Sequence, residues 1–280
     1  MRPLTLAAAV AFAALVLSAR SRAREPLRVG VVSSAATPAP GEALAGCPKG
    51  RFPDGDVCVR LPGDDDEGLD SPVEENTHVE RSGRYAIYDQ IPRRPDRPAD
   101  YDLYRYPIQG FLPGGHSVVS GYDLDRPNET QRRGFSIHAV GHGGVDLPAP
   151  KGTPIPLLAL EHQVDDEEVV FVGHWAGNTI MTRATVRESG QLRDYLVMFG
   201  HLDRVAPGIE PGARVHEGDV IGFVGDTGSP ELVHLHFEVR RIRDGVDVRG
   251  KPAWQLTDGS VSVVCDPRNV LPLRDAPKAP

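Results

Sequence analysis

The sequence predicts a mainly β protein, with an antiparallel sheet in its C-terminal part and a largely irregular region ahead of it. From about Gly110 to Leu273 the chain consists of short apolar runs of strand length punctuated by glycine, and no long amphipathic helix pattern occurs there. Before that segment proline, aspartate and arginine are frequent, and such a composition buries little apolar surface. We therefore expect one β domain preceded by linker or loosely ordered chain.

Runs rich in β-branched and aromatic residues mark the strands of the C-terminal region. Turn signals such as Pro207-Gly208, Pro211-Gly212 and Gly218-Asp219 separate them. The expected strands cover residues 168–173, 179–182, 195–199 and 220–225. We expect them to form a mainly antiparallel sheet.

The first 24 residues have the pattern of an export signal. A positive start at Arg2 precedes an apolar run from Leu4 to Ala19, which is shorter than the roughly 20 apolar residues of a membrane-spanning helix. We expect residues 1–24 to be removed on export to the periplasm, the extracellular space or the cell envelope; an uncleaved anchor is the alternative. The segment from Leu44 to Cys47 resembles a lipoprotein cleavage box, a further alternative. No other run is long and apolar enough to span a membrane.

Residues 25–109 form the expected N-terminal region. Cys47 and Cys58 flank a loop that a disulfide can close after export, which leaves Cys265 as a small buried apolar residue. The acidic run 64–67 lacks the spaced ligands of a calcium loop and is interpreted as a solvated charge cluster. Five tyrosines are expected to pack this region onto the next domain, with stacking on carbohydrate as the alternative: Tyr85, Tyr88, Tyr101, Tyr104 and Tyr106. The main domain is predicted over residues 110–273 and a tail over 274–280.

Composition excludes one class of partner. The 280 residues carry a formal net charge of −8, whereas binding nucleic acid requires clustered Lys and Arg to neutralise phosphates. We therefore expect no nucleic-acid partner. Neither composition nor charge predicts the oligomeric state.

Histidines at two short motifs and one isolated position predict a hydrolytic zinc site. His142 and Asp146 are separated by two glycines, which permit a bend, while His234 and His236 lie two residues apart and so face the same side of a strand. His201 stands alone between them. A hydrolytic zinc site takes three protein ligands and leaves one position for water, so these residues can supply the ligands with histidine to spare. The other histidines are expected at the surface or in packing.

Several further motifs accompany these residues in order along the chain. They are His142-Gly143-Gly144-Val145-Asp146-Leu147, Gly152-Thr153-Pro154-Ile155, Phe199-Gly200-His201-Leu202, Gly218-Asp219-Val220-Ile221-Gly222, Gly225-Asp226-Thr227-Gly228 and His234-Leu235-His236-Phe237-Glu238-Val239. With them, residues 134–240 resemble the lysostaphin-type, LytM-like zinc endopeptidases, which cut the peptide cross-links of bacterial peptidoglycan. The resemblance implies an antiparallel sheet that forms a groove, Zn²⁺ as cofactor and peptidoglycan peptide stems and cross-links as substrate.

Carried over position by position, the resemblance implies that His142, Asp146 and His236 bind zinc. It makes His201 and His234 the catalytic histidines, one as general base and one stabilising the oxyanion, without deciding which is which. The chain departs from the family at Phe199, where a tyrosine is frequent, and at Leu232-Val233, where Gly-Pro is frequent. An extended hairpin over residues 183–193 is expected to influence substrate choice. None of these departures removes an implied ligand.

Three functions are compatible with this pattern. The first is an exported zinc endopeptidase of peptidoglycan, acting in cell-wall remodelling or lysis. The alternatives are a non-catalytic peptidoglycan-binding or amidase-regulating module of the same type, and a zinc peptidase that acts on proteins. The bond that is cut cannot be predicted from these residues. A separate hypothesis is that the N-terminal region covers the site, with Asp125 or Asn128 reaching the metal.

Overall fold

A computed structural model describes residues 51–54, 57–60, 70–79, 85–124, 131–132, 135–136 and 141–274. Within them, the regular structure is mainly β, as the sequence predicted. The single α-helix of the described residues, α1 (Ala253–Leu256), has only four residues. None of the helices in the described part is long and apolar enough to cross a membrane. The expected export signal, the lipoprotein box, the Cys47–Cys58 pair, the acidic run 64–67, Asp125 and Asn128 lie wholly or partly outside the described residues.

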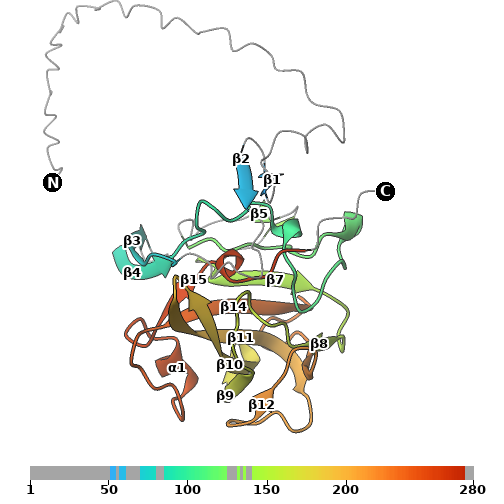
Figure 1. Ribbon diagram of the computed structural model, residues 1–280. Helices are drawn as coiled ribbons and strands as arrows, with labels where there is room; N and C mark the ends of the chain where they lie inside the picture. Colours follow the sequence, from blue (N-terminus) through green and yellow to red (C-terminus); the bar gives the residue numbers. More distant parts are fainter. Residues whose placement is uncertain are drawn as a thin grey trace, which may run out of the picture. The chain divides into compact units, whose positions relative to one another are not determined.

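Four long strands form the centre of the main sheet, stacked side by side in Figure 1. They are β9 (Glu167–Trp175), β10 (Gly177–Glu188), β11 (Gln191–Val205) and β14 (His234–Ile242), in this spatial order and all antiparallel to their neighbours. Each contains one of the predicted runs or the His-x-His motif, but the strands are longer than those runs. The extension has a simple reason: hairpin pairing continues through polar residues that carry no apolar signal, such as Arg187 opposite Leu192.

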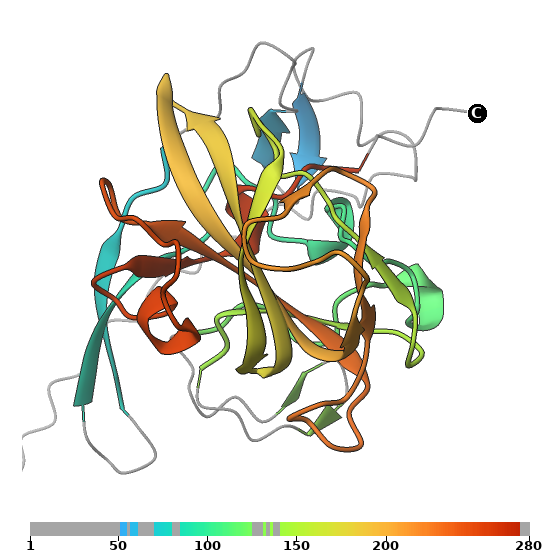
Figure 2. The same cartoon turned by 90° about the horizontal axis from the view of Figure 1, so that it is seen from below.

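Shorter strands continue the sheet at both edges of this centre. Along its free edge β14 pairs first with β7 (Gly144–Pro148) and then with β15 (Ser262–Cys265). Beyond its pairing with β14, β11 pairs with β13 (Val220–Val224), which also pairs with β8 (Pro154–Pro156). The strand β12 (Arg214–Val215) pairs with β9 at the other edge. Figure 2 shows the β10–β11 hairpin extending beyond its neighbouring strands.

Part of the expected N-terminal region belongs to this sheet. The hairpin of β3 (Glu74–Val79) and β4 (Tyr85–Ile91) joins through β4, which lies parallel to β15. Tyr104 is fully buried and Tyr106 nearly so, and both belong to the main hydrophobic core. The expected packing of tyrosines onto the domain is therefore confirmed for these two. The domain boundary at residue 110 stays a prediction. The strands β3 and β4, which lie before residue 110, belong to the same sheet.

The core has two parts, one on each side of the sheet. The larger contains Val145, Phe199, Leu235 and Phe237, and the smaller contains Met181 and Met198 near α1. Cys265 is fully buried in the larger part, as predicted. The remaining elements are β1 (Arg51–Asp54) paired with β2 (Val57–Arg60), β5 (Gln131–Arg132) paired with β6 (Phe135–Ser136), and the 3₁₀ turns η2 (Tyr101–Leu103), η3 (Pro113–Gly115) and η4 (Pro267–Asn269).

Candidate metal centre

The two sequence motifs meet because β7 and β14 are neighbours. In their antiparallel register Asp146 lies directly opposite His236, so the two side chains share one face of the sheet. Leu235 and Phe237, on the opposite face of β14, are 0% and 1% exposed. His142 lies just before β7, where its backbone exchanges two hydrogen bonds with Asp123. Residues 90 positions apart in sequence are thereby brought side by side.

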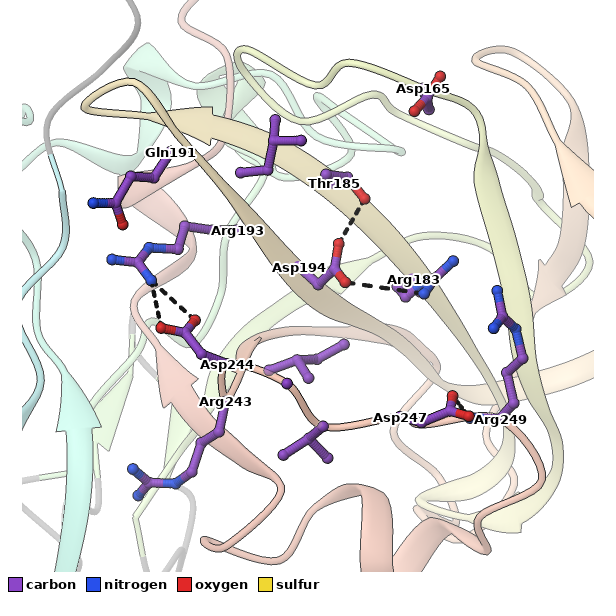
Figure 3. A pocket seen from close by; sticks show the side chains of 14 residues that line it. Asp165, Arg183, Thr185, Gln191, Arg193, Asp194, Arg243, Asp244, Asp247 and Arg249 are labelled. Carbon is purple, nitrogen blue, oxygen red and sulfur yellow. Dashed lines mark hydrogen bonds and ion pairs between the residues drawn. The ribbon is translucent and has the colours of Figure 1, made fainter.

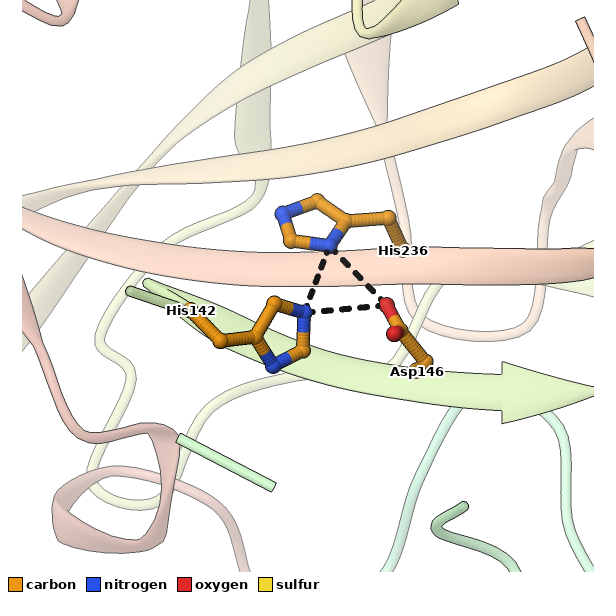
Figure 4. Close-up of side chains that lie close together, drawn as sticks. All are labelled: His142, Asp146 and His236. Atoms are coloured by element: carbon orange, nitrogen blue, oxygen red, sulfur yellow. Dashed lines mark hydrogen bonds and ion pairs between the residues drawn. The ribbon is translucent and has the colours of Figure 1, made fainter. Parts of the chain in front are cut away.

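Three atoms of these side chains converge on one point, as Figure 4 shows. His142 Nε2 and His236 Nδ1 lie 3.0 Å and 3.1 Å from Asp146 Oδ1 and 3.3 Å from each other. Tetrahedral zinc with bonds of roughly 2.0–2.1 Å needs its ligand atoms about 3.3 Å apart. The triangle therefore has the size that a zinc ion requires.

In both histidines, the ring nitrogen that points away from Asp146 has a hydrogen-bond acceptor of its own. The nitrogen that points toward Asp146 is thereby left able to bind a metal. His142 Nδ1 donates to the carbonyl oxygen of Gly121 at 2.7 Å, so the neutral ring carries its lone pair on Nε2. His236 Nε2 lies 3.2 Å from a carboxylate oxygen of Glu238, which can only accept, so the neutral ring carries its lone pair on Nδ1. Two imidazole nitrogens and one carboxylate oxygen are a donor set that suits Zn²⁺.

The electrostatics of this cluster favour a positive charge. Burial would raise the pKa of Asp146, but the neighbouring His142 and the hydrogen bonds from the two histidines hold it well below its usual value. Burial would lower the pKa of His236, yet the hydrogen bonds to Asp146 and Glu238 raise it to about 10. The carboxylate of Asp146 thus lies between the two imidazoles, and that of Glu238 contacts the other side of the His236 ring. This arrangement stabilises positive charge, whether as protons or as a metal ion.

His201 reaches the same site from β11 through an irregular backbone. Its φ is +59°, in the left-handed region that a residue with a Cβ seldom adopts. The backbone N–H donates to the carbonyl of Ala176 at 2.8 Å, and Nδ1 donates to the carbonyl of Thr227 at 2.8 Å. These bonds offset the strain and leave Nε2 with a free lone pair. Burial lowers the pKa of His201, which keeps the ring neutral.

His234 stands beside His201 and has the same type of anchor. Its Nδ1 donates to the carbonyl of Leu232 at 2.8 Å, and its Nε2 lies 3.5 Å from Asp146 Oδ1. The ring centroids of His201 and His234 are 4.7 Å apart. All five residues singled out in the sequence therefore lie in one cluster, with three atoms converging and two rings beside them.

Sequence reasoning missed the residues that orient these rings. Glu238 stands two residues after His236 and so shares its face of β14, a spacing that the sequence contains. The carbonyls of Gly121 and Thr227 leave no sequence signal, because any residue has a carbonyl. The glycines of the first motif also have a different role from the expected bend. Neither Gly143 nor Gly144 has a positive φ, and a Cβ at Gly144 would lie 2.4 Å from the carbonyl oxygen of Phe237.

Other predicted features lie away from this cluster. His174 and His216 are exposed, as expected of surface histidines. The tip of the β10–β11 hairpin lies ten residues along β11 from Gly200, the residue opposite His236, or roughly 30 Å at 3.3 Å per residue. Near that tip lies a pocket of about 720 Å³ whose arginines are paired with carboxylates, as Arg193 is with Asp244 (Figure 3). This distance does not favour contact between the tip of the hairpin and a substrate bound at the cluster of His142, Asp146 and His236.

Comparison with known proteins shows which family the part of the chain that carries these converging side chains resembles. Residues 140–249 match the model of peptidase family M23. This stretch is therefore similar to the M23 peptidases, in agreement with the lysostaphin-type, LytM-like motifs of the sequence.

The chain is also similar to individual proteins. The chain is 33% identical over 114 residues to the DD-carboxypeptidase/endopeptidase Mpg of Neisseria meningitidis serogroup B, covering 38% of this chain and 23% of the relative. It is 28% identical over 137 residues to the peptidoglycan DD-endopeptidase ShyB of Vibrio cholerae, covering 48% and 27%. Among solved structures, the antimicrobial peptidase lysostaphin from Staphylococcus simulans is 21% identical, with 57% and 52% covered and a TM-score of 0.30. The chain spans about a quarter of the length of these two curated relatives.

Proposed function

We propose that this protein is an exported zinc endopeptidase that hydrolyses peptide cross-links of bacterial peptidoglycan. The observation that carries the proposal is the convergence of His142, Asp146 and His236 beside two further histidines, each held by a hydrogen bond from Nδ1 to a backbone carbonyl. The similarity of residues 140–249 to the M23 peptidases, and of the chain to a DD-carboxypeptidase/endopeptidase and a peptidoglycan DD-endopeptidase, supports the substrate class. Export is proposed from the sequence pattern of residues 1–24.

In this proposal the ligands of zinc are His142 Nε2, Asp146 Oδ1 and His236 Nδ1. Zinc bound there supplies a Lewis acid that polarises the scissile carbonyl and makes a water molecule acidic near neutral pH. The protein contributes the fixed directions of the three ligand atoms. The backbone carbonyl of Gly121 and the carboxylate of Glu238 orient the two rings.

The two remaining histidines divide the proton transfers. His201 is the general base, because burial keeps its ring neutral and the Thr227 carbonyl holds the proton on Nδ1. Its Nε2 accepts a proton from the attacking water and returns it to the leaving amine. His234, whose Nε2 lies 3.5 Å from Asp146 Oδ1 beside His201, stabilises the oxyanion in this proposal.

Digestion of purified sacculi tests the proposal. The full chain should release peptide fragments with new amino termini, detectable by mass spectrometry, and a chelator should abolish the release. His201→Ala and His234→Ala should each lose cleavage while retaining zinc, and His216→Ala, at an exposed histidine whose ring pairs with Asp166 and Asp219, should behave as wild type. Binding of sacculi without any released fragment would instead support a non-catalytic module. Cleavage of glycine-rich proteins but not of sacculi would support a peptidase of proteins.

A further inference from the structure

Beyond the zinc ligands, β14 carries two buried charges on the same face as the histidines. Residues at positions 234, 236, 238 and 240 alternate with core residues, so Glu238 and Arg240 continue the row that His234 and His236 begin. The side chains of Glu238 and Arg240 are both 12% exposed. A buried carboxylate and guanidinium are costly to desolvate unless each is fully hydrogen-bonded.

Each oxygen of the Glu238 carboxylate has its own partner. Oε2 lies 3.2 Å from His236 Nε2, and Oε1 accepts a hydrogen bond of 2.8 Å from Arg240 Nη1. Arg240 is held in turn by the segment after β14. Its Nη2 donates to the carbonyl of Thr257 at 2.7 Å, and its Nε donates to Ser262 Oγ at 2.8 Å. The carboxylate is therefore fixed at both ends and cannot turn away from His236.

This arrangement determines which nitrogen of His236 can bind a metal. A carboxylate accepts but does not donate, so it keeps the ring proton on Nε2 and leaves the lone pair on Nδ1, the atom that faces Asp146 and His142. Without the carboxylate, the neutral ring can place its proton on Nδ1, where it blocks coordination. Outer partners of this kind typically change metal affinity by about 10- to 100-fold.

The glycine at position 143 provides an independent observation. A Cβ at Gly143 would lie 3.0 Å from Glu238 Oε2 and 3.0 Å from Val264 Cγ2. The φ of Gly143 is not in the left-handed region, so its backbone conformation does not require glycine. The space beside Glu238 favours it, because with a Cβ here the side chains of Glu238 and Val264 would have to shift by a few tenths of an ångström. The first motif thus leaves room for a carboxylate that belongs to the last motif.

We propose that Glu238 is a positioning residue that holds His236 in its metal-binding tautomer, with Arg240 fixing the carboxylate and Gly143 leaving room for it. This inference rests on the proposed zinc site and adds to it a buried line of contacts from His236 to the start of β15. In this arrangement Glu238 touches neither substrate nor metal. It acts only through the ring of His236.

The test uses Glu238→Gln, which preserves shape but replaces one oxygen by an NH₂ group. Because Arg240 can only donate, it selects the remaining oxygen and turns the NH₂ group toward His236, which favours a proton on Nδ1. We expect zinc affinity, measured by competition with a chromophoric chelator, to fall by about 10- to 100-fold. Long-range ¹⁵N NMR of the metal-free protein, recorded at a pH where the His236 ring is neutral, should show the His236 proton on Nε2 in the wild type and redistributed in the variant. Glu210→Gln, at an exposed glutamate, is the matched control.

Two further measurements separate positioning from a structural role. The melting temperature of each metal-free variant reports on folding, and Glu238→Asp, whose shorter side chain withdraws the carboxylate, serves if Glu238→Gln does not fold. A lower melting temperature with zinc affinity and tautomer unchanged would overturn the inference. If the wild type binds no zinc, the proposed function fails, and the tautomer of the metal-free protein still decides the role of Glu238.

Discussion

Glu167 provides a quantitative test of the packing around the sheet. Its side chain, at the start of β9, is fully buried, and Oε2 accepts a hydrogen bond from the hydroxyl of Thr182. Among the described residues Oε1 has no hydrogen-bond partner. Burial raises the pKa of this carboxyl from 4.5 to about 7, because the ionised form loses its hydration and gains only one hydrogen bond.

The sign and size of the effect follow from that difference. Between pH 4.5 and about 7 the folded state binds the proton that the unfolded state has released, so the free energy of unfolding falls as pH rises through this range. At about 1.4 kcal/mol per pKa unit, ionising Glu167 costs about 3 kcal/mol of stability above pH 8. Glu167→Gln removes the titration while keeping the acceptor for Thr182. We expect the variant to be more stable than wild type by up to about 3 kcal/mol at pH 8 and similar to it below pH 5.

Urea unfolding of metal-free protein between pH 4 and 9 measures this difference directly, since other titrating groups cancel between wild type and variant. Glu168→Gln is the control. Glu168 is the neighbour of Glu167 on the other face of β9, and its pKa is shifted in the opposite direction. A hydrogen bond from Arg249 lowers the pKa of Glu168, so Glu168 stabilises the fold above its unfolded pKa and this contribution is lost in acid. A stability difference for Glu167→Gln that is the same at pH 5 and pH 8 would refute the argument.

Two further predictions concern catalysis. Because burial lowers the pKa of His201 and the base must be neutral, the acidic limb of kcat/KM should lie below pH 6.5; a pH profile with this limb above 6.5 contradicts the assignment. A Cβ at Gly177 would lie 1.9 Å from the Thr227 oxygen that holds His201, so Gly177→Ala should lower kcat at least tenfold while zinc stays bound, as steady-state kinetics and metal analysis can measure. Gly250→Ala is its control, since Gly250 has a similar φ and open space at its Cβ, and equal effects of the two variants would show backbone strain alone.

The sequence predicted those features that depend on local pattern. Apolar runs such as 195–199 lie within strands because β-branched and aromatic side chains pack on a pleated surface. His234 and His236 share a face because side chains of a strand alternate with a period of two. The strands extend further than these runs because their ends pair through polar residues, whose burial depends on the neighbouring strand.

The backbone of His201 and the strand pairing of the N-terminal region were beyond such reasoning. The left-handed φ of His201 depends on carbonyls at Ala176 and Thr227, and carbonyls are present at every position. Pairing of β4 with β15 joins residues more than 170 positions apart. A composition rich in proline and charge carries no information about that contact.

From the sequence alone, the β class of the fold, the face of each motif and the identity of five candidate site residues could be stated. Only the tertiary structure decided that Asp146 lies opposite His236, which nitrogen of each histidine is free, and that Glu238 occupies the space left by Gly143. The physical reason is that side-chain alternation along a strand is a local property of the chain. The choice and register of the neighbouring strand come from packing between distant segments.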